Sequence, residues 1–117
     1  RVPYFNAAAG CDYADAITRL QSDALLARFL QMLPDDPSMA QLTAAMAAGD
    51  AAAAFRAVHT LKGIALNLSL SDLADACAAL TEHLRGRDAL PDGIQPQYDA
   101  VLAQHTRVLD ALAQLTP

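Results

Sequence analysis

His59, Lys62 and Gly63 are the residues of this chain whose types and spacing are best suited to chemistry. A neutral imidazole offers an unprotonated ring nitrogen as a nucleophile. Lys62, the only lysine in the sequence, follows His59 by three residues, and Gly63 follows it by four. Residues three and four apart are neighbours on the surface of a helix. On a helix, this spacing therefore places a cation and a position without a side chain beside a potential nucleophile.

Gly63 is an unfavourable residue for a helix interior, because glycine costs up to about 1 kcal/mol there relative to alanine. In an alanine-rich sequence it indicates a steric need, namely space beside the imidazole for a bulky group or another protein. Phe55 and Leu66 lie on the same face, before and after His59. Two apolar residues around an exposed histidine indicate a docking surface. Packing of either side chain against a neighbouring helix is an equally good interpretation.

The helix that carries these residues is predicted from Ala51 to about Leu68, with Asp50 as its N-terminal cap. On a helical wheel of 100° per residue, one half of this helix is apolar and His59 lies on the other half. His59 is therefore expected to project away from the core, near the middle of a long rigid helix. The residues of the apolar half are Ala54, Ala57, Val58, Leu61, Ile64, Ala65 and Leu68.

Apolar residues at helical spacing also predict the elements of the N-terminal part of the chain. Asp12 is expected to cap a short first helix. A second helix begins at Ser22 and ends at Pro34, because proline disfavours the helical conformation of the residue before it. A third follows the pair Asp36-Pro37 and stops at Gly49.

The C-terminal part contains two further predicted helices. The stretch 69–72 resembles a capping box that opens a helix over residues 71–85, and residues 86–93 form a loop. The apolar stripes of the two helices are Leu73, Cys77, Leu80 and Leu84, and then Ile94, Tyr98, Val101, His105, Val108, Leu112 and Leu115. Narrow stripes joined by short connections predict an all-α fold: an antiparallel up-and-down bundle with one or two short extra N-terminal helices.

Composition limits the kind of protein further. The 117 residues suit a single helical domain over residues 1–117, of which 1–11 are expected to be a poorly ordered N-terminal segment. A hydrophobic content of 54% is enough for a core without metals or disulfides. The net charge of −5 argues against nucleic-acid binding and against a polybasic membrane-surface module.

The sequence also carries expectations about compartment. It contains no apolar run long enough to span a membrane and no signal-peptide pattern, so we expect a cytoplasmic chain without direct membrane contact. Cys11 and Cys77 are expected to be free thiols in a reducing environment. Because the chain begins at Arg1 and not at Met, we expect it to have been trimmed or cut from a longer protein.

The residues around His59 resemble the motif of the histidine-containing phosphotransfer (HPt) domains of bacterial two-component phosphorelays. The family usually has glycine ten residues after the histidine, where this chain has Ser69, which we expect to cap the next helix. The resemblance also extends over the preceding residues 51–58 and the later Leu80-Thr81-Glu82. Its motif is carried here by His59-Thr60-Leu61-Lys62-Gly63, Ala65, Asn67-Leu68 and Leu73.

The resemblance implies a four-helix bundle in which His59 accepts a phosphoryl group from the aspartyl phosphate of a receiver domain and passes it to another receiver. It implies that Lys62 stabilises the phosphoryl group and that Gly63 gives steric access. Arg56, three residues before His59, can offset negative charge as well. The positions expected to bind the partner are Phe55, Arg56, Leu66 and Asn67.

The chain has no glycine-rich phosphate cradle and no acidic cluster for Mg²⁺ on the active helix. We therefore expect a phosphoryl carrier without kinase activity, without a cofactor or metal of its own, and with Mg²⁺ on the partner. The expected partners are a response-regulator receiver domain, a hybrid histidine kinase, or both. The chain is expected to be a monomer, alone or as the cytoplasmic domain of a larger membrane-bound sensor kinase.

Other interpretations compete with this one. A carboxylate-bridged metal bundle needs about four glutamates, and Glu82 is the only one. A helical module that docks on a receiver or a kinase without being phosphorylated stays open, although it would have little reason to keep both His59 and Lys62. His105 is expected at a core position and His83 at the surface, and neither is expected to be a second phosphorylation site.

Overall fold

The computed structural model describes residues 10, 12 and 23–115, and in this part the regular secondary structure is helical. The predicted first helix after Asp12, the thiol of Cys11 and most of the segment 1–11 lie outside the described residues. Within them, the elements in order are α3 (Asp23–Met32), the 3-10 turn η1 (Leu33–Asp35), α4 (Ser38–Ala48), α5 (Ala51–Asn67), α6 (Ser71–Leu84) and α7 (Gln95–Leu115).

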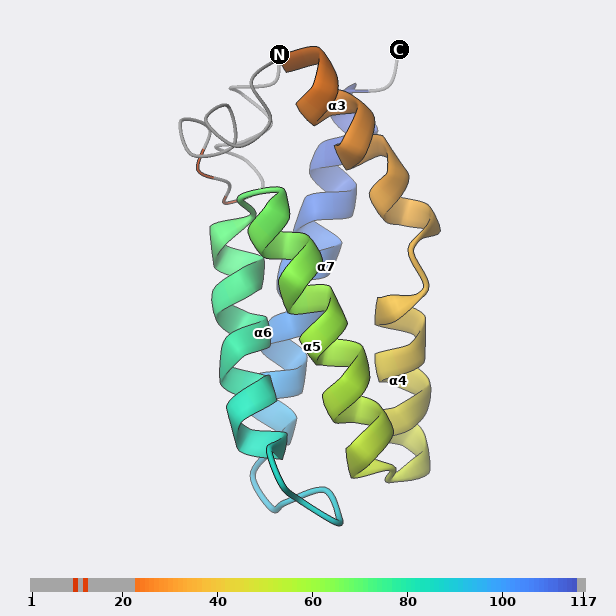
Figure 1. Cartoon of the computed structure of the whole chain (residues 1–117), viewed down its shortest axis with the longest axis vertical. Coiled ribbons are helices and arrows are strands. Elements are labelled where there is room, and N and C mark those ends of the chain that lie inside the picture. The colour runs from red at the N-terminus through yellow and green to blue at the C-terminus, as the bar shows by residue number, and fades with distance from the viewer. Residues whose placement is uncertain (1–9, 11, 13–22, 116–117) are drawn as a thin grey trace.

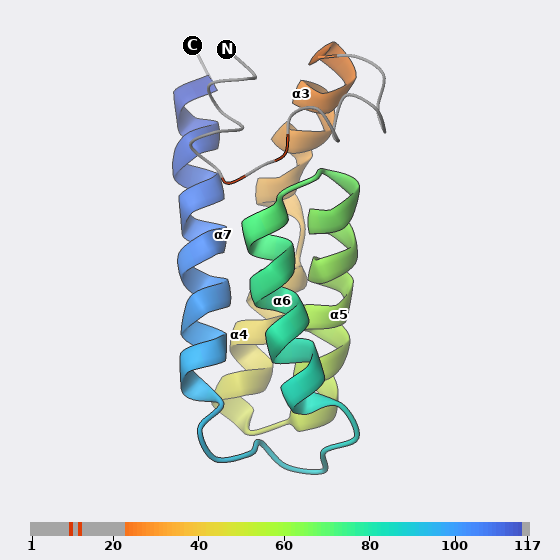
Figure 2. The ribbon, with the colours of Figure 1, turned by 90° about the vertical axis from the view of Figure 1, so that its left-hand side faces the viewer.

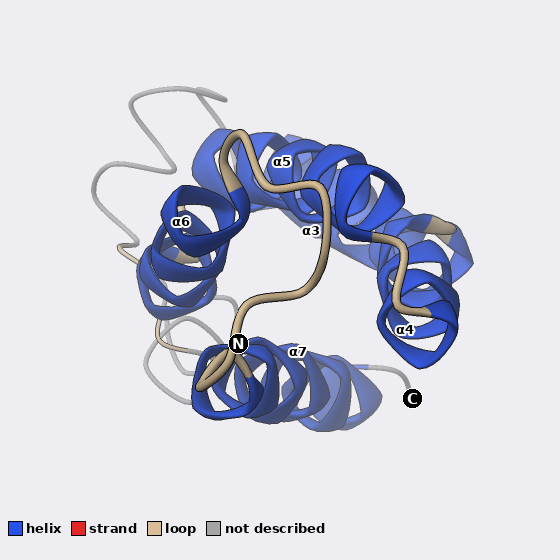
Figure 3. Ribbon diagram, turned by 90° about the horizontal axis from the view of Figure 1, so that it is seen from below, coloured by secondary structure: helices blue, strands red, loops and turns tan. Residues whose placement is uncertain are grey.

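Helices α4, α5, α6 and α7 form an up-and-down bundle, and α3 continues the line of α4 beyond η1 (Figure 1). A view turned by 90° shows α7 running along the full length of the bundle beside α6 (Figure 2). Seen along the bundle, the four helices surround one centre, with α5 and α7 on opposite sides (Figure 3). The Tyr98 hydroxyl donates a hydrogen bond to Thr43 Oγ1 at 3.0 Å and so links α7 to α4. The predicted four-helix bundle is confirmed.

The core lies where the apolar stripes of the helices meet. The predicted stripes of α6 and α7 are buried, except that His105 is half-buried and that the side chain of Leu115 lies outside the described residues. The largest side chains with almost no exposure are Leu30, Leu42, Leu61, Leu70, Leu73, Leu80, Leu84, Val58, Val101 and Val108. The core therefore extends along the whole bundle, and α5 is anchored to it along its length.

The predicted signals at the α4–α5 turn are confirmed. Gly49 ends α4 with a left-handed φ of 70°, and its amide hydrogen-bonds to carbonyls of the last turn. Asp50 then caps α5, because its side chain accepts a hydrogen bond from the amide of Ala53 at 3.0 Å. The start of α5 is thus fixed locally, eight residues before His59.

The α-helix expected to end at Pro34 ends two residues before it, and Pro34 itself lies in a 3-10 turn. The α-helical part of α3 ends at Met32, and the chain continues through the 3-10 turn η1 with Pro34 inside it. Proline is tolerated there because its fixed φ suits the turn and the first residues of a helical segment need no amide donor. The pair Asp36-Pro37 precedes α4 as predicted, and the Asp36 carboxylate accepts a hydrogen bond from the amide of Ser38 at 3.1 Å.

The capping box predicted before α6 is wrong. The N-cap position of α6 is Leu70, and no side chain makes a capping hydrogen bond there. Ser69 instead takes a φ of 55°, the only positive φ of a residue other than glycine in the part of the chain that the structure describes. A left-handed residue after a helix is a common way to end it, and glycine is preferred there because it has no Cβ. Ser69 therefore occupies the left-handed position that glycine usually fills, where the chain reverses between α5 and α6.

The N-terminal segment contacts this same turn. The amide of Asp12 donates to the carbonyl of Ser69 at 2.8 Å, and the amide of Asp72 donates to the carbonyl of Gly10 at 3.2 Å. Asp72 also pairs with Arg107 of α7 at 2.8 Å. The α5–α6 turn is consequently held by groups from the N-terminal segment and from α7.

Replacing Ser69 tests this turn. Ser69→Gly should be more stable than Ser69→Ala by about 1 kcal/mol, because both variants lose the hydroxyl but only alanine keeps the cost of a left-handed Cβ. Urea unfolding followed by circular dichroism measures the difference. Ala79→Gly, at an exposed position of α6, is the control. There glycine should be less favourable than alanine, and the free energy of unfolding should fall by about 1 kcal/mol. An alanine variant at position 69 as stable as the glycine variant would contradict this account.

The half-buried His105 makes stability depend on pH. Burial lowers the pKa of its imidazole from 6.5, and the nearby charge of Asp36 opposes part of that shift. The unfolded chain therefore binds the proton more readily, so this contribution to stability is complete above about pH 6.5 and is lost as the pH falls through the lower folded value. His105→Gln should accordingly lose less stability than the parent chain between about pH 7 and pH 5, as measured by urea unfolding at both pH values. Equal losses of stability in the parent chain and in His105→Gln would contradict this role of His105.

Candidate functional site

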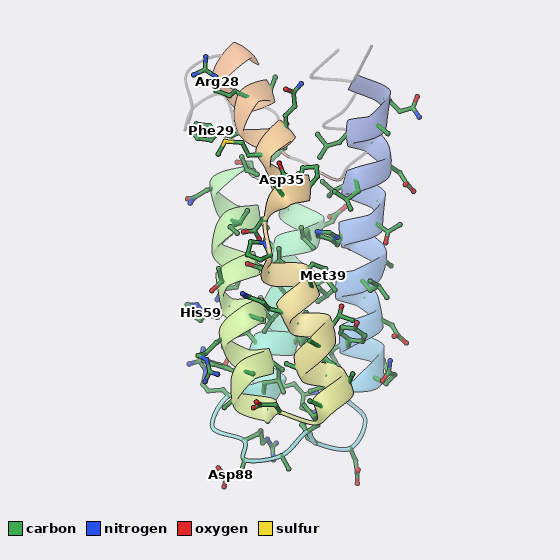
Figure 4. All side chains as sticks on the ribbon, turned by 90° about the vertical axis from the view of Figure 1, so that its right-hand side faces the viewer. Arg28, Phe29, Asp35, Met39, His59 and Asp88 are labelled. Carbon is green, nitrogen blue, oxygen red and sulfur yellow. The ribbon has the colours of Figure 1, made fainter. Side chains whose placement is uncertain are left out.

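Helix α5 carries the predicted site on its outer face. It has 17 residues, and His59 lies near its middle. The His59 side chain is exposed, and Figure 4 shows it pointing away from the bundle. The predicted orientation of α5 is confirmed, with one difference, because Ile64 is only half-buried. The buried residues of the stripe are Ala54, Ala57, Val58, Leu61, Ala65 and Leu68.

The two residues that follow His59 on the same face differ in their surroundings. Gly63 faces open space, since a Cβ added to it would meet no atom within 4 Å. The absence of a side chain is therefore not required by packing inside the domain. Lys62 is half-buried. Its charge acts on Glu82 in α6, whose pKa is lowered first by the hydrogen bond and charge of Arg85 and further by Lys62.

Phe55 lies next to the histidine, with 5.8 Å between the centroids of the two rings and 44° between their planes. The guanidinium carbon of Arg85 lies 5.3 Å from the centroid of the Phe55 ring. Arg85 in turn forms an ion pair with Glu82, with Nη2 to Oε2 at 2.8 Å. Sequence reasoning missed Arg85. The spacing of three residues between Glu82 and Arg85 was visible as a helical ion pair, but nothing in it pointed to the Phe55 ring.

A groove of about 790 Å³ lies where α3 and η1 approach the part of α5 that is C-terminal to His59. Near it, three apolar side chains are unusually exposed: Phe29 by 39%, Met32 by 59% and Leu66 by 47%. Figure 4 shows Phe29 on the same side of the molecule as His59. The residues that line the groove are Phe29, Met32, Leu33, Asp35, Asp36, Ile64, Asn67 and Leu68.

The four predicted docking residues do not form one cluster. Asn67 lines the groove between α3 and α5, and Leu66 is exposed beside it. Arg56 lines a separate hollow of about 510 Å³ between α4 and α5. Phe55 is half-buried and lies under Arg85, towards α6. The structure thus distributes these residues around His59, and their role in binding stays a prediction.

The other reactive side chains have structural surroundings. His83, expected at the surface, is half-buried, and its Nδ1 lies 3.2 Å from the side-chain amide of Gln97 in α7. Cys77 is buried as expected, and burial raises the pKa of its thiol to about 12 although the charge of Lys62 opposes the shift. Among the three histidines, His59 is the one whose side chain is exposed.

The described residues contain neither a metal-binding cluster nor a membrane-spanning helix. Among residues 10, 12 and 23–115, no group of three or more His, Cys, Asp or Glu side chains is placed to hold a metal ion. No described helix combines the length and the apolar character needed to cross a membrane.

Residues 24–115 match the family model of the Hpt domain, which is most of the chain and includes the whole bundle. No curated protein and no solved structure matches the sequence. The matched region contains the exposed histidine, the adjacent lysine and the open glycine described above. The chain therefore belongs to the Hpt domain family, whose members carry phosphoryl groups in two-component signalling.

Proposed function

We propose that His59 accepts a phosphoryl group from the aspartyl phosphate of a receiver domain and relays it to a second receiver. The observation that supports this most is the exposed imidazole in the middle of a helix whose opposite face is buried, next to the open space over Gly63. A nucleophile held on a rigid backbone can meet the phosphorus of a docked partner in one geometry. The receiver is either a free response regulator or part of a hybrid histidine kinase.

The transfer itself needs few groups from this chain. The unprotonated ring nitrogen of His59 attacks phosphorus, a P–N bond forms, and the P–O bond to the receiver aspartate breaks as its carboxylate leaves. The imidazole then releases the proton from its other nitrogen. Relay to the next receiver runs the same exchange in reverse. Lys62, adjacent on the helix, offsets the negative charge of the phosphoryl group.

On this proposal the chain is a carrier and has no kinase activity of its own. The receiver supplies Mg²⁺ and the groups that stabilise the transferring phosphoryl group. The docked receiver covers His59 and extends over Leu66 and Asn67 towards the groove at α3. Exposed apolar side chains next to a polar reactive group are typical of such an interaction surface.

The first test is transfer to a His59→Gln variant. In the presence of a phosphorylated receiver and Mg²⁺, the parent chain should gain an acid-labile, base-stable phosphate, and His59→Gln should gain none because glutamine has no nucleophilic ring nitrogen. Radiolabelled phosphate on a denaturing gel measures the transfer. His83→Gln and His105→Gln are the matched controls and should retain the label.

Circular dichroism should show the same helical content for His59→Gln as for the parent chain, because the side chain is exposed. Label that persists in His59→Gln would show that another residue is the acceptor. A parent chain that binds receivers but never takes up phosphate would instead be a docking module.

Gly63 provides a second test, in which stability and transfer should move in opposite directions. Gly63→Leu should fold at least as well as the parent chain, because glycine is a poor helix former and the added side chain meets open space. Transfer from the receiver should nevertheless fall by roughly tenfold or more, since the side chain occupies the space that the partner needs. Ala103→Leu, at an exposed position of α7, is the control and should leave transfer unchanged. Normal transfer in Gly63→Leu would refute the steric argument.

A further inference from the structure

Four side chains from two helices form a continuous row on the α6 side of His59. Arg85 Nε lies 3.2 and 3.3 Å from the two carboxylate oxygens of Glu82, and Nη2 lies 2.8 Å from Oε2. The Arg85 guanidinium lies over the Phe55 ring at 5.3 Å, and this ring lies 5.8 Å from the His59 ring. Within this row, the Phe55 ring lies between the Arg85 guanidinium and the His59 imidazole.

Each step of the row has the geometry of a recognised interaction. Two guanidinium nitrogens on one carboxylate restrict the direction of the Arg85 side chain more than a single hydrogen bond would. A guanidinium within about 6 Å of an aromatic centroid is attracted by the face of the ring. Two aromatic rings at a centroid distance of about 4.5 to 7 Å and a tilted angle form a favourable pair. The row is therefore held at its outer end by Glu82 and ends on the imidazole.

The two sides of His59 along the helix are consequently unequal. Side chains of a helix lean towards its N-terminus, so His59 leans towards Phe55, four residues before it. Gly63, four residues after it, leaves the opposite side open. An exposed imidazole without such a neighbour would sample several rotamers, and ordering it would add to the barrier of the transfer.

We propose that Arg85, anchored by Glu82, is a positioning residue for phosphoryl transfer, and that it acts by holding the Phe55 ring against the His59 imidazole. This inference rests on the proposed function of His59. It assigns to Arg85 no contact with the phosphoryl group and none with the receiver. Glu82, the only glutamate of the chain, contributes by fixing the direction of Arg85.

The test uses phosphoramidate, a small phosphoryl donor that needs no protein docking. Arg85→Ala should slow phosphorylation of His59 by roughly three- to tenfold, the size expected for the loss of one ordered aromatic contact. Phe55→Leu should slow it by a similar factor. The double variant should be no slower than Phe55→Leu alone, because Arg85 has no ring left to hold. Arg87→Ala removes the same charge two residues away and is the control that should leave the rate unchanged.

A spectroscopic measurement separates positioning from a general loss of structure. In the parent chain, nuclear Overhauser effects should connect the ring protons of Phe55 and His59, and Arg85→Ala should weaken them while thermal stability changes little. The stability change should be small because Arg85 and Glu82 are both largely exposed.

Several results would overturn the inference. One is a rate unchanged in Arg85→Ala, and another is an equal slowing by Arg85→Ala with and without Phe55, which would mean direct action on phosphate. A third is slowing of transfer from a receiver but not from phosphoramidate, which would make Arg85 a docking residue. Each of these leaves the parent chain phosphorylated at His59. A parent chain that neither donor phosphorylates at His59 would instead refute the proposed function, and this inference with it.

Discussion

Burial of one half of α5 is the interaction on which the rest of the structure depends. A helix turns by 100° per residue, so burial of Val58 and Leu61 determines where every other residue of α5 points. Because Val58 and Leu61 are buried, His59 lies on the exposed side of the helix. No interaction of the His59 side chain itself is needed to keep it there. The neighbouring helices supply the buried surface, and the capped turn at Asp50 sets the start of the helix.

The same dependence explains how much of the protein could be predicted from its sequence. Helical spacing is a local property, and it was sufficient for α5, α6 and α7, for their apolar stripes and for the bundle. The outward direction of His59 follows from one helix alone and needs no knowledge of the others. Residues within four positions of each other, such as His59, Lys62 and Gly63, could therefore be recognised together.

What could not be predicted depends on how separate elements meet. The contact between Arg85 and Phe55 joins residues thirty positions apart and follows from the rotation of α6 against α5. The groove beside Asn67 requires the position of α3, which follows from how the 3-10 turn η1 joins α3 to α4. Ser69 illustrates a different reason: serine suits both a cap and a turn, and only the φ angle distinguishes them. Composition and spacing contain no measure of such angles or rotations.

The burial of Cys77 gives the bundle an internal reporter of its own opening. The thiolate is the form that reacts with alkylating reagents, and a thiol with a pKa near 12 provides very little of it at neutral pH. Since Cys77 lies in the stripe that α6 packs into the core, a reagent can reach its sulfur only when the helices separate. The rate at which Cys77 is alkylated in the folded protein therefore reports the opening of the bundle under conditions in which no denaturant is present.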